Sequence, residues 1–155
     1  MRILSRSVKE TIKIGKSLSK FLSRGDILLL EGDLGSGKTV FVKGLAEGQG
    51  INQDKVLSPT FVLMRQYQGK NIQINHLDLY RLHEAGEFAT LGSEEYFYDE
   101  ALTVIEWAKK LKGFFIPADY LEIKFSLISD KERLIKIEAQ GEHYKNILSC
   151  FTGNP

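Results

Sequence analysis

Cysteine and net charge are both scarce in this sequence, and each shortage excludes a class of protein. Cys150 is the only cysteine among 155 residues, which excludes an internal disulfide and disfavours a thiolate metal site. The formal net charge is only +1, so strong electrostatic attraction to nucleic acid or anionic lipid is not expected. No apolar run approaches the roughly 20 residues that cross a bilayer, and the first ten residues lack the apolar core of a signal peptide. The sequence therefore predicts a cytoplasmic protein without membrane contact.

The hydrophobic pattern predicts one α/β domain over residues 1–155, with a frayed tail after about residue 150. Ser7 and Glu10 have the spacing of a capping box at the start of a helix, and residues 27–31 form the continuous apolar run of a strand buried on both faces. The expected elements, in order, are a helix from Ser7 to about residue 24, a strand at 27–31, a helix at 38–48, a hairpin around Gly69, helical pieces within 83–100, a strand at 101–107, a hairpin over 120–139 with Leu121, Ile123, Phe125 and Leu127 facing inward, and a helix near 141–151. This order favours a mixed parallel and antiparallel sheet with a C-terminal β-hairpin.

A glycine-rich loop follows the first apolar strand. Its residues Gly32, Gly37, Lys38 and Thr39 match the spacing G-x-x-x-x-G-K-[ST]. In such a P-loop the backbone N–H groups surround phosphate, the lysine brings positive charge to the β- and γ-phosphates, and the hydroxyl binds Mg²⁺. The strand before the loop and the helix after it are the context that this motif requires, so we predict a three-layer P-loop NTPase-like domain. The residues expected to contact the nucleotide here are Gly35, Ser36, Gly37, Lys38, Thr39 and Val40.

A P-loop also needs an acidic group near the metal, and two carboxylates have a suitable place in the sequence. Glu106 ends the apolar segment "LTVI", and Asp78 lies in the β-like segment "INHLDLY". We prefer Glu106, together with Thr39, as the Mg²⁺ ligand. Asp78 is then expected in the magnesium shell or beside the attacking water, although the sequence alone does not rank the two acids.

Three further positions are candidates for the same site. Thr60, in the stiff turn "SPT", is placed to sense a γ-phosphate, and an ordinary Ser-Pro turn is an equal alternative. Trp107 directly follows Glu106; a tryptophan is more often a core residue, and a place over the site entrance is the alternative. His76, a single histidine on a strand, is interpreted as structural. Because no N-K-x-D segment is present to read guanine, ATP is a better prediction than GTP.

Four stretches, in this order, resemble one family: "GDLGSGKTVF", "SPTF", "HLDLYRL" and "VIEW". The chain is similar to TsaE (also called YjeE), the small P-loop ATPases of tRNA threonylcarbamoyladenosine biosynthesis. The resemblance implies a Mg²⁺-dependent ATPase, weak alone, that assists a TsaD–TsaB complex. That complex attaches a threonylcarbamoyl group to N6 of adenosine 37 in tRNAs that read ANN codons. The transfer belongs to TsaD, tRNA is contacted indirectly, and ATP hydrolysis resets the complex.

The resemblance also implies roles for individual residues. Lys38 and Thr39 match the phosphate and magnesium positions, and Glu106 matches the magnesium-linked acid; the catalytic set is Lys38, Asp78, Glu106 and Thr60, with Trp107 at the nucleotide. The adenine contacts have their candidates on the first helix and near the last turn, namely Val8, Thr11, Lys131 and Arg133. Two positions depart from the family pattern: Val40 stands where many relatives have a second threonine, and Ala108 where proline is frequent.

Two other functions are compatible with a P-loop of this kind. The first is a small kinase or phosphotransferase, although Arg133 is the only arginine after Arg81 and kinases need arginines at the transferring phosphoryl group. The second is a binding module that is gated by the nucleotide and has no significant catalysis.

Overall fold

The computed structural model describes residues 1–83, 87, 100–111 and 117–153, and the helical pieces predicted within 83–100 lie mostly outside these ranges. The described elements are β1 (Arg2–Ser5), α1 (Val8–Leu18), η1 (Ser19–Phe21), β2 (Ile27–Glu31), α2 (Lys38–Gly48), η2 (Gln53–Lys55), β3 (Met64–Gln68), β4 (Gln73–Asp78), β5 (Ala101–Glu106), η4 (Ala108–Leu111), β6 (Tyr120–Leu127), β7 (Arg133–Gln140) and α4 (Glu142–Gly153).

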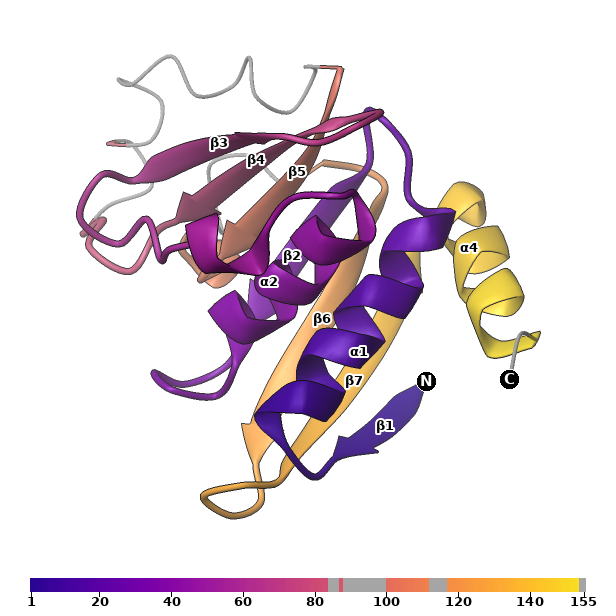
Figure 1. Ribbon diagram of the computed structural model, residues 1–155, viewed down its shortest axis with the longest axis horizontal. Helices are drawn as coiled ribbons and strands as arrows, with labels where there is room; N and C mark the ends of the chain where they lie inside the picture. The colour runs from indigo at the N-terminus through magenta and orange to yellow at the C-terminus, as the bar shows by residue number, and fades with distance from the viewer. Residues whose placement is uncertain (84–86, 88–99, 112–116, 154–155) are drawn as a thin grey trace.

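One mixed sheet organises the described part of the chain (Figure 1). Its seven strands lie in the order β1-β7-β6-β2-β5-β4-β3. The four central strands β6, β2, β5 and β4 are parallel to one another, whereas the pairs β6–β7 and β7–β1 on one side and β4–β3 on the other are antiparallel. The predicted α/β class, the mixed sheet and the C-terminal hairpin are confirmed.

Both predicted hairpins form, and one detail of the second is wrong. In the β6–β7 hairpin, Leu121, Ile123 and Phe125 are buried as expected, but Leu127 is 48% exposed. Leu127 is the last residue of β6, and Figure 1 shows the β6–β7 turn extending beyond α1 and α2. Within the part of the chain that the structure describes, no helix therefore covers this end of the strand.

The strand β1 was not predicted. It is four residues long, lies at the sheet edge and pairs antiparallel with β7, so that Arg2 lies opposite Lys136. Its pattern of two exposed, one half-buried and one buried residue carries little hydrophobic signal. The pairing with β7, at the other end of the chain, decides the structure of this segment.

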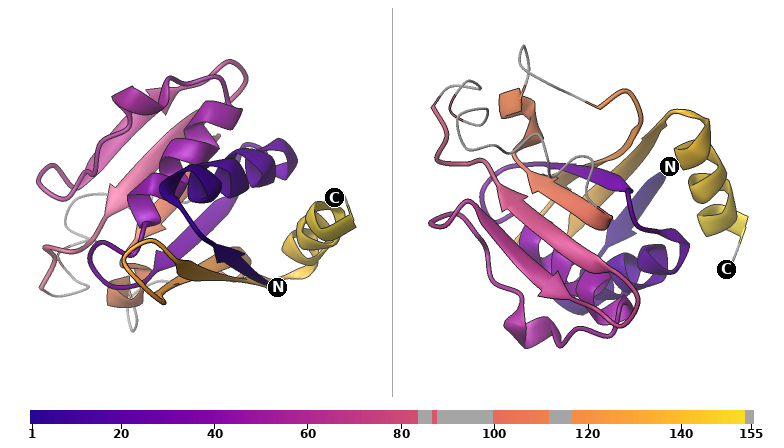
Figure 2. Two further views of the ribbon diagram at one scale, coloured as in Figure 1. Left: turned by 60° about the horizontal axis from the view of Figure 1, so that its bottom comes forward. Right: turned by 90° about the horizontal axis from the view of Figure 1, so that it is seen from above.

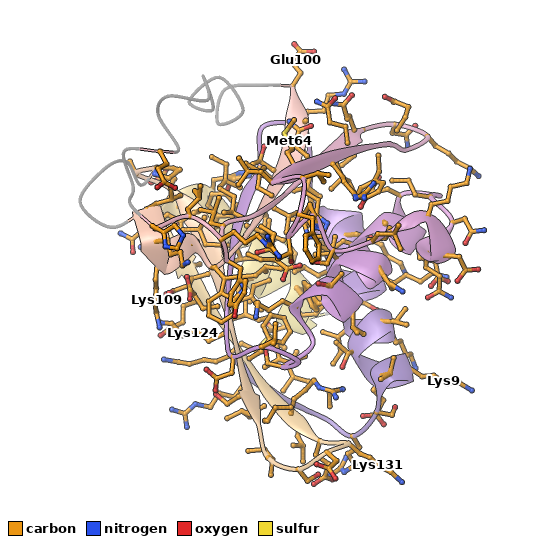
Figure 3. The ribbon with its side chains drawn as sticks, turned by 90° about the vertical axis from the view of Figure 1, so that its left-hand side faces the viewer. Lys9, Met64, Glu100, Lys109, Lys124 and Lys131 are labelled. Atoms are coloured by element: carbon orange, nitrogen blue, oxygen red, sulfur yellow. The ribbon has the colours of Figure 1, made fainter. Side chains whose placement is uncertain are left out.

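The larger hydrophobic core lies between the sheet and the helices α1, α2 and α4. Figures 1 and 2 show α1 and α2 against one face of the sheet, with α4 beside the β7 edge. A smaller core lies on the opposite face, where Ala108 and Leu111 of η4 pack on Leu29, Leu77 and Ile105. Figure 3 shows Lys109 of η4 and Lys124 of β6 on the same side of the molecule.

The helices α1 and α2 approach each other closely because both contain glycine at the contact. A Cβ added to Gly44 would lie 2.2 Å from the carbonyl oxygen of Ile12, and one added to Gly15 would lie 2.5 Å from that of Phe41. Both distances are shorter than Cβ atoms tolerate. The glycine pair therefore sets the distance between the helix that follows the glycine-rich loop and its neighbour.

The predicted terminal helix is present as α4 and continues to Gly153, so Thr152 and Gly153 belong to it and not to a frayed tail. Its Tyr144 hydroxyl accepts a 2.7 Å hydrogen bond from the backbone N–H of Ile27, which attaches the helix to the first residue of β2. No helix within the described ranges combines the length and the apolar character needed to cross a membrane.

Replacement of Gly44 by alanine is expected to lower the free energy of unfolding by about 1–3 kcal/mol, because α1 and α2 must move apart. The measurement is urea unfolding followed by circular dichroism. Gly153→Ala is the matched control, since a Cβ there meets nothing within 4 Å. Equal midpoints for the two variants would contradict the close approach.

Candidate functional site

Three parallel strands end at the same edge of the sheet. In the register of β2 and β5, Leu30 lies opposite Glu106, and in the register of β4 and β5, Asp78 lies opposite Glu106. The glycine-rich loop begins directly after Glu31, the last residue of β2, at the same edge. Loops and strand ends at the carboxyl edge of parallel strands form the usual ligand crevice of open α/β sheets.

The glycine-rich loop turns directly into α2. Gly37 is the N-cap of this helix and has φ 108°, a left-handed conformation that side chains rarely adopt. No side chain caps the helix, so the N–H groups of its first turn are not used by a capping side chain. A Cβ at Gly37 would also come within 3.2 Å of the Arg133 side chain. The conformation therefore requires glycine here, and a side chain would in addition displace Arg133 by a few tenths of an ångström.

Lys38 lies under the loop, with 4% of its surface exposed. Its ammonium group donates hydrogen bonds to the carbonyl oxygens of Gly32 (2.6 Å) and Asp33 (3.0 Å) and lies 4.2 Å from the centre of the Trp107 ring. Burial lowers the pKa of Lys38 below its usual value, while the nearby carboxylates, Glu106 foremost, oppose that shift. The loop thus holds a positive charge inside the site.

Two side chains contact the same oxygen of Glu106. The Thr39 hydroxyl donates a 2.7 Å hydrogen bond to Glu106 Oε1, and His76 Nε2 lies 2.8 Å from the same oxygen. Glu106 is 3% exposed and His76 is fully buried. The residue pair predicted to bind the metal is therefore in direct contact.

Asp78 holds the turn at residues 58–60. Its Oδ2 accepts hydrogen bonds from the hydroxyls of Ser58 (3.1 Å) and Thr60 (2.5 Å), and its Oδ1 accepts one from the backbone N–H of Tyr80 (2.9 Å). The Tyr67 hydroxyl exchanges two hydrogen bonds with the backbone of Leu57, just before the turn. Asp78 therefore connects the end of β4 to the segment that carries Thr60.

Trp107 has a strained backbone, with φ 60° in a non-glycine residue. Its N–H donates a 3.0 Å hydrogen bond to Leu30 O, and its ring lies 5.2 Å from that of Tyr80. Such conformations cost about 1–3 kcal/mol and persist where the surrounding structure imposes them. Here the result is an indole ring placed over Lys38.

These side chains surround one cavity of about 160 Å³. Most of the site residues expected from the sequence line it, together with Leu34 and Ser58. Its lining consists of Leu34, Gly35, Gly37, Lys38, Thr39, Val40, Ser58, Thr60, Asp78, Glu106 and Trp107.

The predicted residues that do not line this cavity are five, namely Ser36, Val8, Thr11, Lys131 and Arg133. The Ser36 side chain is buried, and its hydroxyl has no hydrogen-bond partner among the described residues. Val8 is 52% exposed, whereas Thr11 is fully buried and its hydroxyl accepts a 3.0 Å hydrogen bond from Arg133 Nη1. Arg133 lies against Gly37 but not in the cavity.

The donors at the cavity fit a magnesium ion that arrives with a phosphate ligand. Within the described ranges, no three His, Cys, Asp or Glu side chains form a cluster that holds a metal by itself. Mg²⁺ in nucleotide sites commonly takes only one or two protein oxygens, together with phosphate oxygens and water. Thr39 and Glu106, whose oxygens lie 2.7 Å apart, provide such a pair.

The contact between His76 and Glu106 was missed at the sequence level, where His76 was interpreted as structural. The available signal is its position two residues before Asp78, which places both side chains on the same face of β4. Which residues of β5 lie beside that face, however, depends on the β4–β5 register.

The fold and the loop define the class of this protein: an α/β protein with a glycine-rich loop at a strand-to-helix junction, where P-loops occur. Residues 5–135 match the model of the family "Threonylcarbamoyl adenosine biosynthesis protein TsaE". The chain belongs to the TsaE family.

Individual relatives agree with this assignment. The chain is 39% identical to a tRNA threonylcarbamoyladenosine biosynthesis protein TsaE of Bacillus subtilis, over 88% of this chain and 84% of the relative. It is 36% identical to the TsaE of Treponema pallidum, over 88% and 99%. The crystal structure of YdiB from Bacillus subtilis superposes with a TM-score of 0.84 at 34% identity and covers 99% of this chain and 94% of that one.

Replacement of Asp78 by alanine is expected to release the 57–62 segment, because Ser58, Thr60 and the Tyr80 N–H lose their shared acceptor. We expect faster hydrogen exchange of the Tyr80 amide and a loss of about 1–3 kcal/mol in unfolding free energy. Asp54→Ala, at an exposed position in η2, is the control. An unchanged exchange rate at Tyr80 would contradict the proposed anchoring.

Proposed function

We propose that this protein binds and hydrolyses ATP with Mg²⁺ and so assists the TsaD–TsaB complex in the threonylcarbamoylation of N6 of adenosine 37 in tRNAs that read ANN codons. The protein itself does not transfer the threonylcarbamoyl group, and it contacts tRNA indirectly, as part of a cytoplasmic assembly. Membership in the TsaE family supports the pathway. The arrangement of side chains around the cavity supports the proposal of ATP binding.

One observation carries the proposal for ATP: the hydrogen bond from Thr39 to Glu106, at the first turn of α2, in the same cavity as Lys38. A hydroxyl, a carboxylate and a lysine are the three side chains that a P-loop uses around a phosphate-bound magnesium ion. The free first turn of a helix adds N–H donors and a favourable dipole for the phosphates.

Each residue then has a distinct task. Lys38 supplies positive charge to the β- and γ-phosphates, and Thr39 and Glu106 hold Mg²⁺, which neutralises charge that develops on the phosphates. Thr60, kept near the cavity by Asp78, responds to the γ-phosphate. Asp78 orients the attacking water or a water of the metal shell. Trp107 covers the entrance above Lys38.

The structure disfavours the kinase alternative. Among the described residues, no arginine lines the cavity and Lys38 is the single basic side chain there. Kinases use several cations to neutralise the phosphoryl group in transfer. A binding module without catalysis would bind ATP in the same way but would not hydrolyse it significantly. The experiment must therefore measure hydrolysis separately from binding.

The test of the function is ATP hydrolysis by the purified protein, alone and with TsaD and TsaB. We expect slow release of free phosphate by the protein alone, and a several-fold higher rate with both partners. Formation of a phosphorylated small molecule in place of free phosphate would support a kinase. Partner binding that follows ATP occupancy, with no stimulated hydrolysis, would support the gated binding module and contradict the ATPase proposal.

Replacement of Thr39 by valine is expected to weaken Mg²⁺-dependent ATP binding on the order of 10–100-fold, because it removes the hydroxyl and leaves a similar volume. Val40 cannot substitute, since it has no hydroxyl. Thr39→Ser keeps the hydroxyl and is expected to bind like the unaltered protein. Calorimetric titration with ATP, with and without Mg²⁺, provides the measurement. Equal binding by both variants would contradict the role of Thr39.

A further inference from the structure

His76 occupies an unusual position for a structural histidine. Its side chain is fully buried, with its ring 6.2 Å from that of Tyr67. Its Nε2 lies 2.8 Å from Glu106 Oε1, whereas its Nδ1 has no hydrogen-bond partner among the described residues. A buried histidine that serves only for packing has no need to direct one nitrogen at a carboxylate of the candidate site.

The hydrogen-bond partners determine which nitrogen carries the proton. A neutral imidazole has one N–H and one bare nitrogen, and an ionised carboxylate only accepts hydrogen bonds. A buried N–H without an acceptor is costly, so the unpartnered Nδ1 is the bare nitrogen. A neutral His76 is therefore expected to carry its proton on Nε2, from which it donates to Glu106.

Both donors reach the same oxygen of Glu106. Oε1 accepts from Thr39 and from His76, while no hydrogen bond from the described residues reaches Oε2. Two donors of fixed direction on one oxygen leave the carboxylate little freedom to rotate. Oε2 is thus left available among the described residues, and Glu106 is one of the residues that line the cavity.

We propose that His76 is a positioning residue: through its Nε2–H it fixes the Glu106 carboxylate so that the free oxygen serves Mg²⁺ or a water of its shell. This inference rests on the proposed ATP and Mg²⁺ site and adds a residue to it. His76 does not contact the nucleotide. Partners of this kind orient metal-ligating groups in many sites, and their loss commonly lowers metal affinity or activity about 10–100-fold.

The first test examines the tautomer in the nucleotide-free protein and does not depend on the function. ¹⁵N-labelled protein is measured by long-range ¹H–¹⁵N NMR, and the His76 signals are identified by their loss in His76→Gln. We expect a protonated Nε2 and a bare Nδ1. A proton on Nδ1 would overturn the proposal.

The second test separates positioning from packing. His76→Gln retains a side-chain N–H donor of similar reach, whereas His76→Leu removes it. The affinity for ADP is measured by calorimetry across Mg²⁺ concentrations and in EDTA. We expect His76→Leu to raise the Mg²⁺ concentration for half-maximal effect about 10–100-fold, with affinity in EDTA unchanged. His76→Gln is expected to restore most of the Mg²⁺ effect.

His143→Gln is the matched control, because His143 lies on α4 and its Nε2 contacts Asp26, not a residue of the cavity. Equal losses with Mg²⁺ and in EDTA would show a packing role and overturn the proposal, as would an unchanged Mg²⁺ requirement in both His76 variants. Absence of any ADP binding by the unaltered protein with Mg²⁺ would instead overturn the proposed function, and the role of His76 with it.

Discussion

The parallel pairing of β2, β5 and β4 brings three separate parts of the chain to one edge of the sheet. Its register places Leu30, Glu106 and Asp78 side by side, although they lie far apart in the sequence. Everything at the candidate site depends on this register, because a shift of one residue would turn Glu106 and Asp78 to the opposite face. The hydrophobic residues of both faces oppose such a shift, since all six residues of β5 are buried.

The second constraint is the place of α2 over the sheet. Thr39 reaches Glu106 only if the helix begins at the correct height above β5, and Gly37 permits the turn that starts it. Gly44, about two turns after Gly37, lets α1 pack closely against the same helix. The two glycines therefore act together. Gly37 sets where α2 begins, and Gly44 sets the distance of α2 from α1.

The sequence predicts the local parts of this protein well and the long-range parts poorly. The loop, the helix after it, both hairpins and the acids at strand ends follow from spacing and alternation within short windows. The structure places Thr39, Thr60, Asp78, Glu106 and Trp107 around one cavity, as the four stretches imply. The strand β1 and the contact of His76 with Glu106 depend on partners distant in sequence, and no local pattern carries that information.

The ammonium group of Lys38 is held by the loop that carries it. This group has two carbonyl partners from the loop and an aromatic ring above it. Under the proposed function, a phosphate meets a lysine that the loop already holds in place, because two of its three N–H groups donate to loop carbonyls. A side chain that is already ordered loses little conformational entropy when it takes a ligand.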